Sequence, residues 1–121
     1  MTYNKTSDAK ARSYKFALEI IEITDNLEKS LAAQVIAKQL IRSATSVGAN
    51  IVEAQASPTR KDFSLFLSHA LKSANETSYW LKLLRDSDKL SEVLSASVIR
   101  ECEELAKMLG ASLITVKQRE T

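Results

Sequence analysis

Apolar residues recur at helical spacing along most of the chain. After Pro58, seven positions are separated alternately by four and three residues: Phe63, Leu67, Ala70, Ala74, Thr77, Leu81 and Leu84. This seam lasts three heptads, the spacing of helices that pack at shallow angles in bundles. It predicts a helix over residues 60–86. Thr59, with Asp62 three positions later, resembles a capping box, and the Asp-Ser-Asp sequence at 86–88 should end the helix.

Three further segments carry the same period and predict helices over residues 8–24, 31–56 and 91–117. The first has two apolar stripes: Tyr14, Ala17, Leu18 and Ile21 form one, and Phe16, Ile20 and Ile23 form the other. Because one stripe suffices for a monomeric surface helix, the surplus indicates self-association. Four helices joined by short links predict an all-α protein, an antiparallel up-down-up-down four-helix bundle, with one domain over residues 1–121.

Composition agrees with long helices and few turns, since the chain has only two Gly and one Pro. Gly48 lies inside a predicted helix, in a run of small residues at 43–49. Glycine in a helix interior costs about 1 kcal/mol relative to alanine. Close approach by a helix of the same chain or of another subunit would offset that cost.

Charge and cysteine content narrow the class of protein. The formal net charge is +2, from 17 Lys and Arg against 15 Asp and Glu, which does not by itself imply nucleic-acid binding. Cys102 is the only cysteine, so the chain forms no internal disulfide. No secretory signal and no apolar run long enough to cross a membrane is recognisable. We therefore expect a cytoplasmic protein without a membrane partner.

The sequence lacks the residue combinations of common active sites. His69 is the only histidine, and no Cys or His pair has metal-ligand spacing. Cys102 falls on a core position of the last predicted helix, where cysteine acts as a small hydrophobe. No glycine-rich loop is available to hold phosphate. We expect no enzymatic activity, no metal and no cofactor.

Polar residues form stripes beside two apolar seams. One stripe holds Arg42, Ser46, Asn50 and Glu53, and the other holds His69, Ser73, Glu76 and Trp80. We expect these side chains to be partly buried and paired, Arg42 with Glu76 or Glu53 and Asn50 with Ser73, since unpaired buried polar groups are costly. The network either fixes helix register and subunit geometry, which we favour, or contacts a ligand directly.

The same residues resemble a known family. Residues 41–53 fit the pattern R-x-A-x-S-[IV]-x-A-N-I-x-E, and residues 62–77 fit a second block that ends in S-x-x-E at Ser73 and Glu76. Both blocks are typical of the bacterial family found as open reading frames in 23S ribosomal RNA intervening sequences. The resemblance covers residues 10–117. Two positions where relatives often have glycine are Ala54 and Lys72 here.

The resemblance implies a four-helix bundle that assembles as a homopentamer around a central channel, with no established enzymatic activity. We therefore interpret the protein as a non-enzymatic oligomeric scaffold or interaction protein. A related branch resembles accessory proteins of diversity-generating retroelements, which pair with a reverse transcriptase and bind nucleic acid. The alternative is thus an accessory protein that binds RNA or single-stranded DNA. Its candidate phosphate contacts are Lys5, Lys10, Arg12, Lys15, Arg60 and Lys61.

Overall fold

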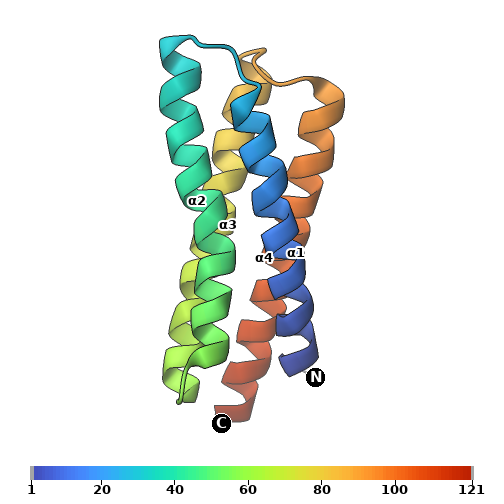
Figure 1. The fold of residues 1–121 in the computed structure, drawn as a ribbon. Helices are drawn as coiled ribbons and strands as arrows, with labels where there is room; N and C mark the ends of the chain where they lie inside the picture. The colour runs from blue at the N-terminus through green and yellow to red at the C-terminus, as the bar shows by residue number, and fades with distance from the viewer. Residues whose placement is uncertain (1, 121) are drawn as a thin grey trace.

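The computed structural model describes residues 2–120, and the side chains of residues 8–119. Four helices make up this part of the chain: α1 (Thr2–Asp25), α2 (Leu31–Ala56), α3 (Arg60–Asp86) and α4 (Glu92–Glu120). They run alternately up and down, so that the two chain ends and the α2–α3 link lie at one end (Figure 1). Each helix packs against two others, α1 and α3 both contacting α2 and α4. The predicted antiparallel four-helix bundle is confirmed.

Hydroxyl caps set where three of the helices begin. In each, a side-chain oxygen accepts the backbone N–H three residues on: Ser30 from Ala33, Thr59 from Asp62, and Ser91 from Leu94. Each cap satisfies one N–H that the first helical turn leaves without a partner. The bounds of α2 and α3 are those predicted from the sequence.

The predicted bounds of the outer helices were wrong. Helix α1 begins at Thr2 instead of residue 8, and α4 covers Glu92–Glu120 instead of 91–117. Extending a formed helix is easier than nucleating one, so a packed helix continues until a stop signal. No Gly or Pro stands before residue 8 or after Gly110. The apolar period alone therefore made both helices too short.

Helix α3 ends where the Asp-Ser-Asp sequence predicted. Asp88 has a left-handed backbone, with φ of 61°. The N–H of Lys89 donates to the carbonyl of Leu84 at 2.9 Å, and the N–H of Asp88 donates to that of Arg85 at 3.1 Å. This is a Schellman-type ending, in which glycine is the usual left-handed residue and aspartate is a tolerated one.

The buried side chains form two layers along the bundle axis. The layer toward the α1–α2 and α3–α4 links holds larger residues, including Phe16, Ile20 and Leu84. The layer toward the chain ends relies more on alanine, with Ala54, Ala70 and Ala74 buried between helices. Small side chains let helix backbones approach closely, as the small-residue run in α2 suggested.

Candidate functional site

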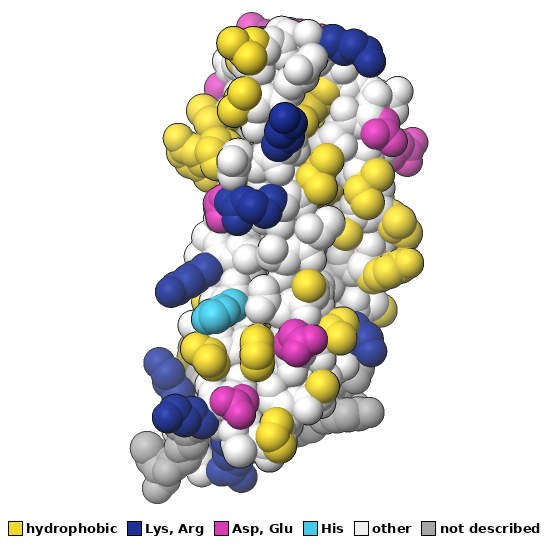
Figure 2. Space-filling model, turned by 60° about the vertical axis from the view of Figure 1, so that its left-hand side comes forward, with side chains coloured by type: hydrophobic (Ala, Val, Ile, Leu, Met, Phe, Trp, Pro, Cys, Tyr) yellow, Lys and Arg dark blue, Asp and Glu magenta, His cyan; other side chains and the backbone are white. Residues whose placement is uncertain are grey.

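An apolar groove runs between α1 and α2 on the outside of the bundle. It encloses about 740 Å³ and is lined by Tyr14, Leu18 and Ile21 from α1 and by Thr45, Ala49 and Val52 from α2, among others. Tyr14 is 70% exposed and Leu18 52% exposed. Hydrophobic side chains follow the right-hand side of the face seen in Figure 2. The groove thus leaves a large apolar surface uncovered.

The two stripes of α1 explain how the groove arises. Phe16, Ile20 and Ile23 enter the core, as one of the predicted stripes should. The other stripe, which includes Tyr14 and Leu18, lies outside the core and forms one wall of the groove. Both stripes therefore exist, but only one is used within the chain.

Gly48 forms part of the groove floor, where α1 and α2 come closest. A Cβ added at Gly48 would lie 3.1 Å from Oγ of Ser13, which is tighter than ordinary contact. Ser13 is fully buried, and its hydroxyl donates to the carbonyl of Lys10 at 3.0 Å. A helix of the same chain therefore accounts for this glycine, so another subunit is not needed to explain it.

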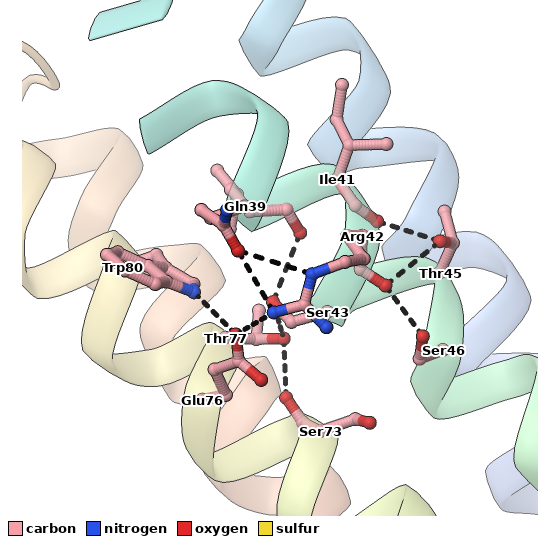
Figure 3. Close-up of polar contacts among 11 residues, drawn as sticks. Gln39, Ile41, Arg42, Ser43, Thr45, Ser46, Ser73, Glu76, Thr77 and Trp80 are labelled. Atoms are coloured by element: carbon pink, nitrogen blue, oxygen red, sulfur yellow. Dashed lines mark hydrogen bonds and ion pairs between the residues drawn. The ribbon is translucent and has the colours of Figure 1, made fainter. Parts of the chain in front are cut away.

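The predicted partner of Arg42 is present on the α2–α3 face (Figure 3). Arg42 forms an ion pair with the Glu76 carboxylate and also donates to Oε1 of Gln39 at 3.0 and 3.2 Å. The same Glu76 oxygen accepts from Nε1 of Trp80 at 3.0 Å. The Arg42 side chain is 58% exposed, so the expectation that it would be partly buried was wrong. An exposed ion pair of this kind contributes little to stability.

Other predicted contacts within the network do not form. The amide of Asn50 donates to the carbonyl of Ser46 on its own helix at 2.8 Å instead of reaching Ser73. The Ser46 hydroxyl likewise donates to the carbonyl of Arg42 at 2.7 Å. Glu53 is exposed at the end of α2, away from Arg42. Side chains that satisfy themselves on their own helix need no partner across the interface.

A second polar contact between α2 and α3 lies deeper, between residues that the polar stripes did not include. The hydroxyls of Ser43 and Thr77, both fully buried, share a hydrogen bond of 2.8 Å between α2 and α3. Oγ1 of Thr77 also lies 2.7 Å from the carbonyl oxygen of Ser73. Thr77 was predicted to lie on the buried seam of its helix. Its hydroxyl, among the alanines and leucines of that seam, was the sequence signal from which a buried polar contact could have been predicted. A buried hydroxyl needs such a partner.

Arg12 forms an ion pair within the bundle. Its guanidinium donates to both carboxylate oxygens of Glu101, at 3.0 and 2.6 Å, joining α1 to α4. The hydrogen bond to Glu101 raises the pKa of Arg12, with burial acting in the opposite direction. A bidentate pair fixes both side chains in one geometry. Arg12 therefore joins α1 to α4, and its role as a phosphate contact stays a prediction.

The remaining candidate cations do not share one surface. Lys10 borders the α1–α2 groove, and Lys15 borders a separate groove between α1 and α4. Arg60 and Lys61 lie together at the start of α3, where Arg60 donates to the carbonyl of Arg119 at 3.3 Å. Lys5 lies outside the residues whose side chains are described. Lys117 and Arg119 are exposed cations near the end of α4 that were not among the predicted phosphate contacts.

Cys102 and His69 do not form a catalytic pair. Cys102 is buried, and desolvation, helped by nearby Glu103, raises the pKa of its thiol to about 12. Its sulfur lies 3.1 Å from the carbonyl oxygen of Ala74. A thiol in this state is protonated at neutral pH and unreactive. His69 is exposed on α3 and packs edge-on against Phe66.

Comparison with known proteins places these features in a family. The family model described as 23S rRNA-intervening sequence protein matches residues 5–111. The chain belongs to this family. The Arg42–Glu76 pair, the Ser43–Thr77 hydroxyls and the apolar groove all lie inside the matched region.

A solved relative shares both sequence and fold with this family member. It is a protein of unknown function from the S23 ribosomal protein family of Bacteroides thetaiotaomicron VPI-5482, with 37% sequence identity and a TM-score of 0.85. The similarity covers 90% of this chain and 97% of the relative. No match was found among curated proteins.

Two features are absent from the described residues. They contain no group of three or more His, Cys, Asp or Glu side chains placed to hold a metal ion. In the same part of the chain, no helix combines the length and the hydrophobicity that crossing a membrane requires. The apolar groove between α1 and α2 is a feature that packing within the chain does not explain.

Proposed function

We propose that this protein is a non-enzymatic scaffold that assembles from identical copies through the α1–α2 groove. The observation that carries the proposal is the uncovered apolar wall of Tyr14, Leu18 and Ile21. Exposed apolar side chains that are grouped along one groove can mark an interaction site. We take the number of copies to be five, because the resemblance to the intervening-sequence family implies a homopentamer.

A non-enzymatic role is supported by the state of the reactive side chains. Cys102 is protonated and buried, and His69 stands on the surface beside an aromatic ring. The polar network on α2 and α3 is directed at its own helices and at the α2–α3 contact. Its arrangement favours the role of setting helix register over that of contacting a ligand.

The oligomer is tested by light scattering coupled to gel filtration at micromolar concentration. We expect a mass five times the chain mass of 13.4 kDa. Leu18→Asp places a charge on the groove wall without touching the core, because Leu18 is 52% exposed, and should give a folded monomer. The matched control Leu18→Met keeps the wall apolar and should keep the mass. A monomeric wild-type protein, or an intact oligomer in Leu18→Asp, would overturn the proposal.

A further inference from the structure

The charges of this bundle are separated along its axis. One half, residues 8–15, 45–74 and 104–119, contains the described ends of the chain and the α2–α3 link. It carries nine Lys and Arg against four Asp and Glu, a formal charge of +5. The other half, residues 16–44 and 75–103, carries seven Lys and Arg against ten Asp and Glu, or −3. The small net charge of the chain is therefore the sum of a positive half and a negative half.

Screening makes the two halves act separately. Each helix is roughly 40 Å long at about 1.5 Å per residue, so the centres of the halves lie about 20 Å apart. This exceeds the Debye length of about 8 Å at physiological ionic strength. A charged partner at one end of the bundle thus experiences the field of that end and little of the other. The overall charge of +2 is a poor guide to what this surface binds.

The positive half ends in exposed cations of two helices, here called the basic end: Arg60 and Lys61 in the first turn of α3, and Lys117 and Arg119 near the end of α4. The hydrogen bond from Arg60 to the carbonyl of Arg119 brings the start of α3 and the last described turn of α4 together. Lys and Arg side chains gather at this lower end in Figure 2. Among the residues whose side chains are described, Asp62 and Glu53 are the acidic residues near these helix ends, so the cations remain in excess there.

We propose that the basic end binds the phosphodiester backbone of a nucleic acid. Lys and Arg that neutralise phosphates release counterions, which supplies most of the sequence-independent affinity for nucleic acids. An anionic membrane is the less suitable partner, because surface binding to lipid also needs apolar side chains that insert. Leu65 lies four residues after Lys61 and Ile114 three residues before Lys117, so both of these exposed hydrophobic residues are set back from the cations toward the middle of the bundle.

The test compares charge reversal at the two ends of the bundle. Lys61→Glu/Lys117→Glu alters the basic end, and Lys29→Glu/Lys38→Glu makes the same charge change in the negative half. All four lysines are exposed. Binding of labelled 20-nucleotide RNA and single-stranded DNA is measured by fluorescence anisotropy at 50 and 200 mM salt. Circular dichroism and light scattering establish that each variant keeps its fold and mass.

Four phosphate contacts predict that wild-type affinity falls about 50-fold between the two salt concentrations, and two contacts predict about sevenfold. We expect the affinity to fall about 50-fold for wild type and for Lys29→Glu/Lys38→Glu. For Lys61→Glu/Lys117→Glu we expect a fall of about sevenfold or less. Similar results for RNA and DNA would assign the contact to phosphate, and a preference for RNA would add the 2′-hydroxyl.

Three outcomes would overturn the proposal. Equal weakening by both double variants would mean that overall charge, and not the basic end, governs binding. Absence of oligonucleotide binding at 50 mM salt would exclude a phosphodiester contact. Sedimentation with vesicles containing phosphatidylserine, without oligonucleotide binding, would assign the basic end to a membrane instead. The basic end is distinct from the apolar groove, so a monomeric protein could still pass this test.

Discussion

The two sides of α2 differ in how completely they are covered. Toward α3, Ala44 and Ala74 are buried, and the buried hydroxyls of Ser43 and Thr77 pair across the contact. Toward α1, Gly48 touches Ser13, but Thr45, Ala49 and Val52 remain on the wall of an open groove. One side is a finished intramolecular interface, while the other is only partly closed.

The difference shows that burial within one chain does not use all the apolar surface of this protein. Helix α1 directs Phe16 and Ile20 into the core but leaves Tyr14 and Leu18 outside. A protein that folds as a monomer gains nothing from the second stripe, since exposed apolar side chains favour association. We infer that the closed side serves the fold and the open side serves assembly.

The largest expected effect is a difference in unfolding free energy between substitutions at two neighbouring residues of α2. Ile51 is fully buried and Val52 is 44% exposed in the groove. In the monomeric Leu18→Asp background, Ile51→Ala should cost about 2–5 kcal/mol of unfolding free energy, because it leaves a cavity. Val52→Ala should cost less than about 0.5 kcal/mol there. Urea unfolding followed by circular dichroism measures both.

The same pair also tests whether copies cover the groove. If the wild-type protein assembles as proposed, the cost of Val52→Ala in unfolding free energy should increase with protein concentration, since the oligomer then contributes to stability. The cost of Ile51→Ala should not change with protein concentration, because the wild type and this variant gain the same stability from assembly. If the two variants had equal effects in the monomer, the distinction between the closed and open sides would be wrong.

A smaller effect is expected for the hydroxyl pair on the closed side. Ser43→Ala and Thr77→Val should each cost about 1 kcal/mol, the usual contribution of a buried hydrogen bond. The double variant should cost less than the sum of the two, because the second substitution removes a group that has already lost its partner. Ser95 provides the control, as it is buried but bonds within α4 to the carbonyl of Glu92. Ser43→Ala and Ser95→Ala should be additive, and additivity in the Ser43–Thr77 pair would contradict the assignment.

Much of the fold could be predicted because the apolar period identifies the helices and the capping residues mark where they begin. The seam from Phe63 to Leu84 and the cap at Thr59 fixed both bounds of α3. The start of α1 and the end of α4 were missed, since residues 2–7 and 118–120 extend these helices without an apolar pattern of their own. Period shows which face is buried, whereas helix ends depend on stop signals.

The site was less predictable because side-chain partners depend on register between helices. The Arg42–Glu76 pair was anticipated from opposite charges on adjacent stripes, and it is present. The pairing of Arg12 with Glu101, 89 positions away, required knowing that α1 packs against α4 at that level. The charge separation likewise emerges only once the antiparallel order assigns each segment to one half of the bundle. Neither could be read from local spacing.

The smallest expected effect concerns Gly48, at the edge of the open side. Gly48→Ala gains about 1 kcal/mol of helix propensity, but the new Cβ would lie 3.1 Å from the buried Oγ of Ser13. The gain and the tight contact should nearly cancel. Ser13→Ala removes that oxygen and leaves a Cβ at an ordinary 3.6 Å, so Gly48→Ala/Ser13→Ala should be about 1 kcal/mol more stable than Ser13→Ala alone. Thermal unfolding of the four proteins in the Leu18→Asp background measures this coupling. If Gly48→Ala stabilises equally with and without the Ser13 hydroxyl, then the contact with α1 does not explain the glycine, and its place on the groove floor in the assembled protein does.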